Sequence, residues 1–340
     1  MAGSAGLAAA YMLPARAAGR VPYGVAVELP PFRDVPAMKE LLAAHADLVV
    51  PMNALKWASL RYDRDKFDFS GADEIIDFAK ANGRAIHGHA LLWYAFNPAW
   101  LDGIVSGREL ERVLDEHIDT VVSRYAGTIA SWDVVNEAVA HDPLTQGKWR
   151  AGVWYDVLGP AHVEKAFSRA AKADPSARLA FNDYDLEDDS PRTKARQDAV
   201  LDIVRRLQDR NVPIHQIGMQ AHLYGERKIG HDNLRKFLRA LKSLGVDVSV
   251  TELDVIDWRM PADATERDTL AAGLVDDYLG TVFSELTPRS VTTWGLADPT
   301  SWIGETFPRK DSALARPLPF DADWQPKAMF DVIRRYTGAA

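Results

Sequence analysis

Two glutamates stand where buried strands are expected to end. The stretch SWDVVNEAVAHD is apolar for several residues and then places Asn136 and Glu137 side by side, and the stretch VTELDV carries Glu252 and Asp254. Paired carboxyl groups on either side of a sugar ring hydrolyse glycosidic bonds, one as a protonated acid and the other as an anion. The two glutamates therefore predict glycoside hydrolysis, provided that the fold brings them together.

The neighbours of the two glutamates indicate a role for each. In a closed barrel, His222 on the adjacent strand would lie beside both Glu252 and Asp254. A histidine between two carboxylates donates hydrogen bonds and favours the ionised form of Glu252. Glu137 follows an apolar strand and would approach Gln220, and desolvation together with repulsion from Glu252 would favour its protonated form. We therefore expect Glu137 to be the acid/base and Glu252 the nucleophile; taken singly, each could equally be an exposed glutamate at a strand end.

Strand-like runs alternate with segments of helical periodicity along the chain. Helical stretches such as GADEIIDFAKANG and DNLRKFLRALKSLGV have apolar residues at i, i+3, i+4 and i+7 and end near glycine. Such alternation predicts a parallel sheet with helical crossovers. Eight runs that fill the length favour an α/β fold, a single-domain (β/α)8 TIM barrel, over an open doubly wound sheet. The runs cover residues 23–29, 46–52, 85–93, 129–137, 177–184, 214–223, 247–255 and 290–298.

Polar residues gather at the carboxyl ends of these runs. Barrel enzymes build their active sites at this end of the strands. One polar strand end would carry no information, but seven in succession indicate a shared site. They hold Asn53 and Lys56; His87, His89 and Trp93; Asn136 and Glu137; Asn182 and Asp183; Gln220 and His222; Glu252 and Asp254; and Trp294 and Asp298.

Tryptophans, a pair of histidines and an acidic run also lie at or near the expected strand ends. Tryptophans near the strand ends offer apolar surfaces on which pyranose rings stack, and the candidates are Trp57, Trp93, Trp294 and Trp302. His87 and His89 share one face of their strand, but no acidic third ligand is evident nearby, so no metal is expected. The acidic run DLEDDS at 185–190 is interpreted as a solvated loop.

Composition excludes several partners. The chain has 340 residues, of which 47% are hydrophobic and 26% charged, and its formal net charge is −8. The charge and the lack of a basic run argue against nucleic acid. No cysteine is present, so disulfides and thiolate metal sites are excluded. No stretch reaches the ~18 apolar residues of a membrane span. We expect a monomer that needs no cofactor and acts on a polysaccharide or oligosaccharide.

The first twenty residues differ in composition from the rest. Residues 1–20, MAGSAGLAAAYMLPARAAGR, are dominated by alanine, glycine and leucine, and ARAA resembles a small-residue cleavage site. The charged start of a signal peptide is missing. The segment is interpreted as a disordered tail or the remnant of a truncated export signal, and residues 21–340 as the catalytic domain. An export signal would place the protein in the periplasm or outside the cell.

An ordered set of motifs resembles the endo-β-1,4-xylanases of glycoside hydrolase family 10. WDVVNEA, GHALLW, FNDYDLE, IGMQAHL, VTELDV and WGLADPTSW carry the resemblance, which runs from about Tyr23 to about Ile333. It implies a TIM barrel and a retaining double displacement, with the acid/base at Glu137 and the nucleophile at Glu252. These roles agree with those expected from the chemistry.

The same resemblance implies binding roles for other residues at the strand ends. Asn136 would hold the 2-hydroxyl of the sugar at the cleavage site, with Gln220 near the acid/base. Asn53 would reach the sugar in the −2 subsite, the second on the non-reducing side of the cleaved bond. The remaining implied roles are Lys56, His89 and Trp93 along the −1 subsite, His222, Asp254 and Tyr184 as supporting residues, and Trp294 and Trp302 as floor and wall.

Three positions depart from the pattern of the family. Met52 stands where a glutamate usually precedes Asn53, Tyr94 where a histidine is usual, and Ile303 where an arginine is common. A hydrogen bond to a charged group is worth about 1.5–3 kcal/mol, so losing the glutamate predicts roughly 10–100-fold weaker −2 binding unless another group compensates. Restoring glutamate at position 52 should then raise the turnover of xylotriose. Alternatively, methionine simply fills the space with a modest loss of activity.

The sequence therefore predicts a retaining endo-β-1,4-xylanase with an altered −2 subsite. Two alternatives remain open. One is a related barrel glycosidase that acts on another or a decorated β-linked pyranoside. The other is a carbohydrate-binding barrel without catalysis, which the presence of both carboxylates disfavours.

Overall fold

The computed structural model describes residues 20–339. The segment expected at 1–20 lies outside the described residues, except for its last residue, Arg20. The guanidinium of Arg20 pairs with Asp47 at 3.0 Å. From Arg20 onward the chain enters the first strand of the barrel within three residues.

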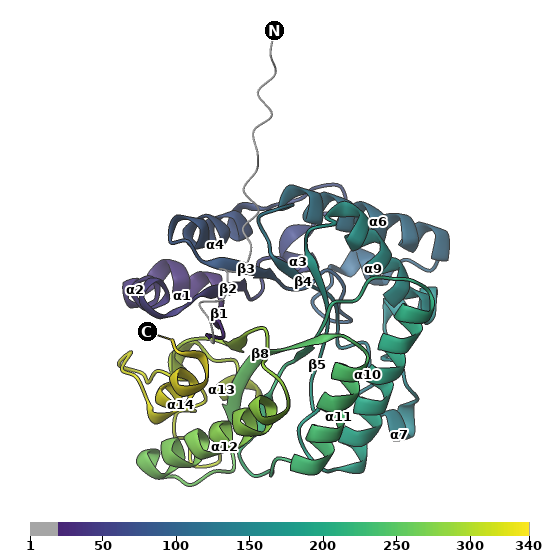
Figure 1. The fold of residues 1–340 in the computed structure, drawn as a ribbon. Helices are drawn as coiled ribbons and strands as arrows, with labels where there is room; N and C mark the ends of the chain where they lie inside the picture. Colours follow the sequence, from purple (N-terminus) through teal and green to yellow (C-terminus); the bar gives the residue numbers. More distant parts are fainter. Residues whose placement is uncertain (1–19, 340) are drawn as a thin grey trace.

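Parallel strands form a closed barrel at the centre of the molecule (Figure 1). The first strand, β1, pairs in parallel with both the second and the last strand of the barrel, which closes the sheet. Each of the eight expected runs contains a barrel strand, so the predicted TIM barrel is confirmed. Within residues 20–339 the barrel strands are β1 (Tyr23–Val27), β2 (Leu48–Pro51), β3 (Ala85–Gly88), β4 (Ser131–Asn136), β5 (Arg178–Asp183), β6 (Gln216–Met219), β8 (Asp247–Ile256) and β9 (Val291–Thr293).

The sixth run, expected as one strand, is divided in two. Strand β6 ends at Met219, and a short strand, β7 (His222–Tyr224), follows it. Ala221 between them has φ of 61°, in the left-handed region that interrupts a strand. Strand β7 then pairs with the last part of β8, with His222 opposite Asp254. The break therefore sets His222 beside the strand that carries Glu252.

Helices surround the barrel, and the purple N-terminal and yellow C-terminal parts lie next to each other in Figure 1. Helix α10 illustrates how these helices start: Ser190 accepts a hydrogen bond from the Thr193 amide, and Pro191 occupies the first turn, where its missing N–H is not needed. The helices of the described chain are α1 (Leu29–Asp34), α2 (Pro36–His45), α3 (Trp57–Leu60), α4 (Ser70–Ala81), α5 (Ala99–Asp102), α6 (Gly107–Arg124), α7 (Pro143–Gln146), α8 (Val153–Leu158), α9 (Ala161–Ala173), α10 (Pro191–Asp209), α11 (His231–Ser243), α12 (Ala264–Glu285), α13 (Ile303–Thr306) and α14 (Ala328–Thr337).

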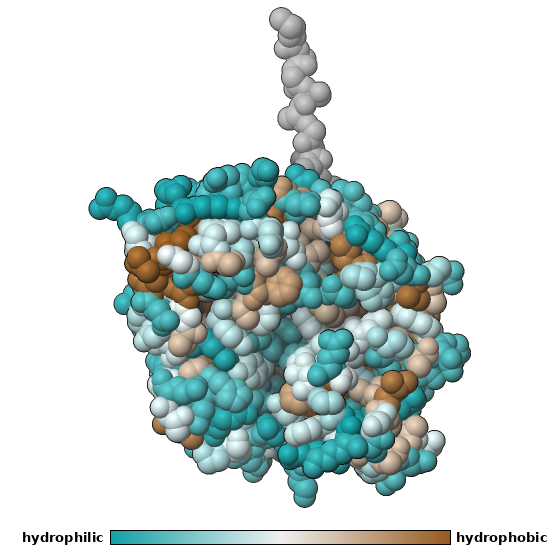
Figure 2. Space-filling model, turned by 180° about the vertical axis from the view of Figure 1, so that it is seen from behind, coloured by the Kyte–Doolittle hydropathy of each residue, from teal (hydrophilic) through white to brown (hydrophobic). Residues whose placement is uncertain are grey.

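Apolar side chains pack between the barrel and the helices. In α4, Ile75, Ile76 and Ala79 are buried on one face, as the periodicity of that segment predicts. The face of the molecule in Figure 2 is mostly hydrophilic, with small hydrophobic groups separated by polar side chains. In the part of the chain that the structure describes, no helix has the length and apolar character needed to cross a membrane.

Candidate active site

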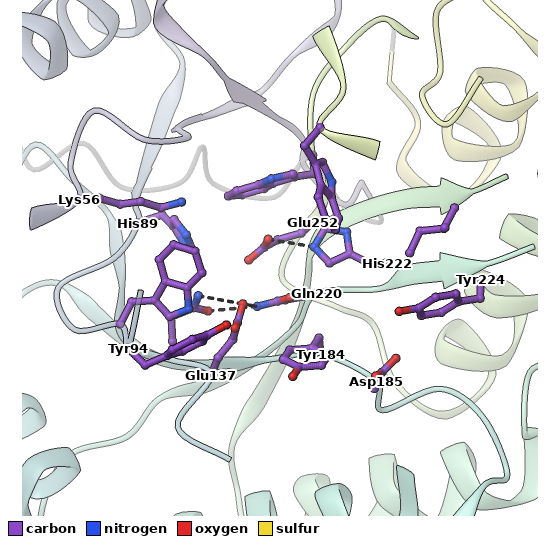
Figure 3. Close-up of a pocket in the computed structure, with 15 residues that line it drawn as sticks. Lys56, His89, Tyr94, Glu137, Tyr184, Asp185, Gln220, His222, Tyr224 and Glu252 are labelled. Carbon is purple, nitrogen blue, oxygen red and sulfur yellow. Dashed lines mark hydrogen bonds and ion pairs between the residues drawn. The ribbon is translucent and has the colours of Figure 1, made fainter. Parts of the chain in front are cut away.

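A cavity of about 280 Å³ lies at the carboxyl ends of the barrel strands. Figure 3 shows Glu137 and Glu252 in its middle, Lys56 and His89 toward one end, and Tyr224 toward the other. The structure therefore brings together strand ends that are far apart in sequence. Its lining residues are Lys56, His89, Trp93, Tyr94, Asn136, Glu137, Tyr184, Asp185, Gln220, His222, Tyr224, Glu252, Ile256, Trp294 and Trp302.

Glu137 follows the last residue of β4. Its φ is 56°, a strained conformation for a residue other than glycine, and such strain is typical of functional sites. The carboxylate atom Oε1 accepts hydrogen bonds from Gln220 Nε2 at 3.0 Å and from Asn136 Nδ2 at 3.3 Å. Amide donors from two strands thus hold Glu137 toward the cavity (Figure 3).

Glu252 projects from β8, and only 4% of its surface is exposed. Its Oε1 accepts a hydrogen bond from Asn182 Nδ2 at 2.6 Å. Its Oε2 lies 3.2 Å from His222 Nε2. Both oxygens of this buried carboxyl group therefore face nitrogen atoms of neighbouring side chains.

His222 joins the two carboxyl groups of β8. Its Nδ1 lies 2.8 Å from Asp254 Oδ1, and Trp302 Nε1 donates to Asp254 Oδ2 at 2.9 Å. Burial disfavours the imidazolium, but Asp254 and Glu252 outweigh this effect and raise the pKa of His222 well above its usual value. At neutral pH His222 is therefore a cation that donates a hydrogen bond from each ring nitrogen.

Asn182, at the end of β5, connects the two halves of the site. Its Nδ2 donates to Asn136 Oδ1 at 2.9 Å as well as to Glu252, and its Oδ1 accepts from Thr251 Oγ1 at 2.7 Å. The absence of a side chain at Gly218 makes room for it, since a Cβ there would lie 2.1 Å from Asn182 Oδ1. Asn182 thus fixes the spacing between the strand of Glu137 and that of Glu252.

Lys56 and His89 lie at the end of the cavity that is farther from Tyr224 (Figure 3). Lys56 Nζ donates to Asn53 Oδ1 at 2.7 Å and lies 4.4 Å from the centre of the Trp93 ring. Burial lowers the pKa of Lys56, although Glu252 and Glu137 oppose the shift. His89 Nδ1 is bound to Asp133 Oδ2 at 2.8 Å, which orients its ring. This end of the cavity therefore offers hydrogen-bond donors beside an aromatic surface.

The side chains around the cavity suit a reaction in which one carboxyl group acts as an acid and the other as an anion on an uncharged ring. One glutamate is held by amides, and the other lies between an amide and an imidazolium. The tryptophans Trp93, Trp294 and Trp302 supply apolar walls. Within residues 20–339, no group of three or more histidine or carboxylate side chains is arranged to hold a metal ion.

Comparisons with known proteins agree with this chemistry. The model of glycosyl hydrolase family 10 matches residues 13–336. The chain belongs to this family. It is 36% identical to a β-1,4-xylanase of Dictyoglomus thermophilum (86% of this chain, 82% of the relative) and 36% identical to endo-1,4-beta-xylanase B of Paenibacillus barcinonensis (86% and 89%). The crystal structure of xylanase 10B from Thermotoga petrophila in complex with xylobiose superposes with a TM-score of 0.85 at 29% identity, covering 94% of each chain.

As a member of glycosyl hydrolase family 10, the protein is a retaining glycoside hydrolase. The three departures from the family pattern lie in different environments. Met52 is buried against Ala26, Val50 and Trp294. Tyr94 is 38% exposed and lines the cavity. Ile303 is fully buried in α13 and does not line it.

Two expectations from the sequence are wrong. Trp57 is not a sugar platform: its ring stacks on His117 at 3.6 Å, and its Nε1 donates to the Leu91 carbonyl within the core. The acidic run at 185–190 is not simply solvated. Asp185 is buried and paired with Arg192, and Glu187 is buried, which raises its pKa to about 8.

Three lining residues were not singled out from the sequence: Asp185, Tyr224 and Ile256. Strand alternation provides a signal for Tyr224, because Tyr224 comes two residues after His222 on the same face of β7. Ile256 likewise comes two residues after Asp254 on β8. No pattern in the sequence distinguishes Asp185 from the exposed acidic residue at 189.

Proposed function

We propose that the protein is a retaining endo-β-1,4-xylanase in which Glu137 is the acid/base and Glu252 the nucleophile. The observation that carries this assignment is the pair of hydrogen bonds to Glu252, one of them from the cationic His222. A carboxylate held as an anion attacks the anomeric carbon, while the protonated Glu137 gives its proton to the departing glycosidic oxygen. The bond to the leaving sugar breaks as the bond to Glu252 forms.

The second step reverses these roles. Glu137, now ionised, removes a proton from water as the water oxygen attacks the anomeric carbon, and Glu252 leaves as a carboxylate. Gln220 and Asn136 would keep Glu137 aimed at the oxygen in both steps. The −1 sugar would lie against Trp93 and Trp294, with Lys56, His89 and Asn136 on its hydroxyls.

The −2 subsite would differ from that of the family. Asn53 remains available there, but Met52 presents an apolar surface in place of a carboxylate, and Tyr94 replaces a histidine at the mouth. These changes alter the contacts of the glycone and leave the catalytic pair in place. Unless another group supplies the missing carboxylate, the enzyme would be weak on plain xylan or would accept a decorated sugar at −2.

The substrate is proposed to be xylan or a xylo-oligosaccharide, acted on by a monomer. Support comes from the relatives, which include a xylanase solved with xylobiose and a mutant xylanase from Thermoanaerobacterium saccharolyticum solved with xylotriose. We further propose that residues 21–340 form the catalytic domain and that the protein acts in the periplasm or outside the cell.

Covalent trapping tests the mechanism. Incubation with a 2-deoxy-2-fluoro xylobioside bearing a good leaving group should inactivate the enzyme and add one 2-deoxy-2-fluoroxylobiosyl group, a disaccharide, to the peptide that contains Glu252, as seen by mass spectrometry. Label on another residue would overturn the assignment.

A panel of aryl xylobioside, aryl xyloside and aryl cellobioside tests the choice of substrate. A preference for the cellobioside would favour the related barrel glycosidase. No turnover of any of the three would favour the carbohydrate-binding barrel without catalysis.

A further inference from the structure

The end of β1 carries a carboxyl group beside Met52. In the parallel pairing of β1 with β2, Ala26 lies opposite Val50, and the Met52 amide donates to the Val27 carbonyl at 3.0 Å. Continuing this register places Glu28 next to Met52. Side chains alternate along a strand, so Glu28 lies on the same face as Ala26, and Met52 on the same face as Val50. Adjacent strands are about 4.8 Å apart.

The packing of this face supports the placement. Ala26, Val50 and Met52 are buried in one cluster with Trp294, which also lines the catalytic cavity. Glu28 directly follows β1 in an extended conformation, so it continues the alternation of the strand onto this face, and it is partly exposed. The acidic function missing at position 52 is therefore present one strand away.

Hydrogen bonds connect Glu28 to the cavity. Its Oε2 accepts from Asn53 Nδ2 at 2.5 Å, and Asn53 Oδ1 in turn accepts from Lys56 Nζ at 2.7 Å. Lys56 lines the cavity, and Glu28 is among the carboxylates that oppose the lowering of its pKa by burial. Glu28 and Asn53 together offer an acceptor and a donor side by side, the combination that binds a sugar hydroxyl.

We propose that Glu28 supplies the carboxylate that recognises the sugar in the −2 subsite, in place of a glutamate at position 52. The inference rests on the proposed xylanase function. It changes the expectation for Met52→Glu: with Glu28 present, a second carboxylate on the same face of the neighbouring strand meets a like charge, so the single substitution should not improve −2 binding.

A ratio of two substrates isolates this subsite. An aryl β-xyloside fills only the −1 subsite, whereas the matching aryl β-xylobioside also fills −2, so the ratio of their kcat/KM values measures the contribution of the second sugar. Glu28→Gln should lower the ratio about 10-fold or more, because a hydrogen bond to a charged group is worth more than one to a neutral amide. Glu40→Gln, which removes an exposed carboxylate from nearby α2, is the matched control and should leave the ratio unchanged.

The double variant completes the test. In the Glu28→Gln background, Met52→Glu should recover most of the lost ratio, while Met52→Glu alone should not raise it above that of the unmodified enzyme. An unchanged ratio in Glu28→Gln, or an equal gain from Met52→Glu in both backgrounds, would overturn the proposal. Glu28→Asp, which keeps the charge but withdraws it by one methylene, should also lower the ratio.

These outcomes are separate from a failure of the proposed function. If the unmodified enzyme hydrolyses neither aryl xyloside nor aryl xylobioside, the xylanase assignment itself is wrong. If it hydrolyses both and the Glu28 variants keep its ratio, the assignment stands and the role of Glu28 is rejected. Thermal unfolding of each variant shows whether a loss of activity reflects a loss of fold.

Discussion

His222 Nε2 lies 3.2 Å from Glu252 Oε2, and the second nitrogen of the same ring is bound to Asp254. One imidazole ring is therefore bonded to two carboxyl groups that project from the same face of β8. The arrangement depends on the break at Ala221, which shifts β7 out of line with β6 and pairs it with the end of β8. A backbone feature between β6 and β7 thus decides which side chain lies beside Glu252 on β8.

Replacing His222 by glutamine should make stability depend less on pH. Since the folded protein raises the pKa of His222, its contribution is fully present below the unfolded value of about 6.5 and is lost as the pH rises through the folded value. The difference in melting temperature between the unmodified enzyme and His222→Gln should therefore be largest at mildly acidic pH and shrink at alkaline pH. Thermal unfolding across this range measures it; a constant difference would contradict the cationic state.

Gly218→Ala should lower kcat without touching a group that contacts the substrate. The added Cβ would lie 2.1 Å from Asn182 Oδ1, so Asn182 must move and lengthen its hydrogen bonds to Asn136 and Glu252. Loss of a hydrogen bond to a charged group costs about 1.5–3 kcal/mol, which corresponds to roughly a 10–100-fold fall in kcat. Steady-state kinetics on an aryl xylobioside provides the measurement.

The matched control for this prediction is Gly273→Ala in α12. A Cβ at Gly273 meets no atom within 4 Å, and alanine favours a helix over glycine. This variant should keep the activity of the unmodified enzyme and gain up to about 1 kcal/mol in stability. Equal kinetics in the two variants would show that Asn182 does not position Glu252.

The barrel could be predicted because strand-like runs alternate with segments of helical periodicity along the whole chain. Glu137 directly follows β4, as predicted, whereas Glu252 lies within β8, which continues to Ile256. The break at Ala221 was not predictable, because alanine normally continues a strand and no turn residue marks the position. Trp57 was misassigned for a related reason: proximity to a strand end does not reveal that α3 turns the ring toward His117 and the core.

The proposed role of Glu28 could not be predicted from any single sequence motif. At its own position it resembles any polar residue before a helix with prolines in its first turn, here Pro30 and Pro31 of α1. Its relation to Met52 appears only when the register of β1 against β2 is known. Strand alternation identifies the face, but the sequence alone does not give the partner strand or the offset between the two strands.

Glu137→Ala should separate the two steps of the reaction. Removing the acid should lower turnover of an unactivated xylo-oligosaccharide by about 10²–10⁴-fold, the usual contribution of general acid–base catalysis. An aryl xylobioside whose phenol leaves without a proton should lose much less in its first step, and added azide should speed the second step by replacing the activated water. Kinetics on both substrates measures the effect; an equal loss on both, without rescue by azide, would exclude Glu137 as the acid/base.

Arg196→Met should strongly destabilise the fold around the end of β5. The Arg196 guanidinium pairs with Asp183 with neither side chain exposed, and its Nε donates to the Tyr184 carbonyl at 2.9 Å. Burial already raises the pKa of Asp183 to about 6 against the opposing effect of Arg196.

Without its partner the buried Asp183 carboxylate should cost about 3–5 kcal/mol of unfolding free energy at neutral pH. The cost should shrink at acidic pH, where Asp183 is neutral. Arg239→Met, which breaks an ion pair with Glu285 from a side chain that is 65% exposed, is the control and should leave the free energy of unfolding nearly unchanged. Guanidinium unfolding at two pH values measures both variants. A loss for Arg196→Met that matches the control would mean that the buried pair does not anchor this end of the barrel, and that the remaining hydrogen bonds of Asp183 to the Val139 and Tyr184 amides suffice.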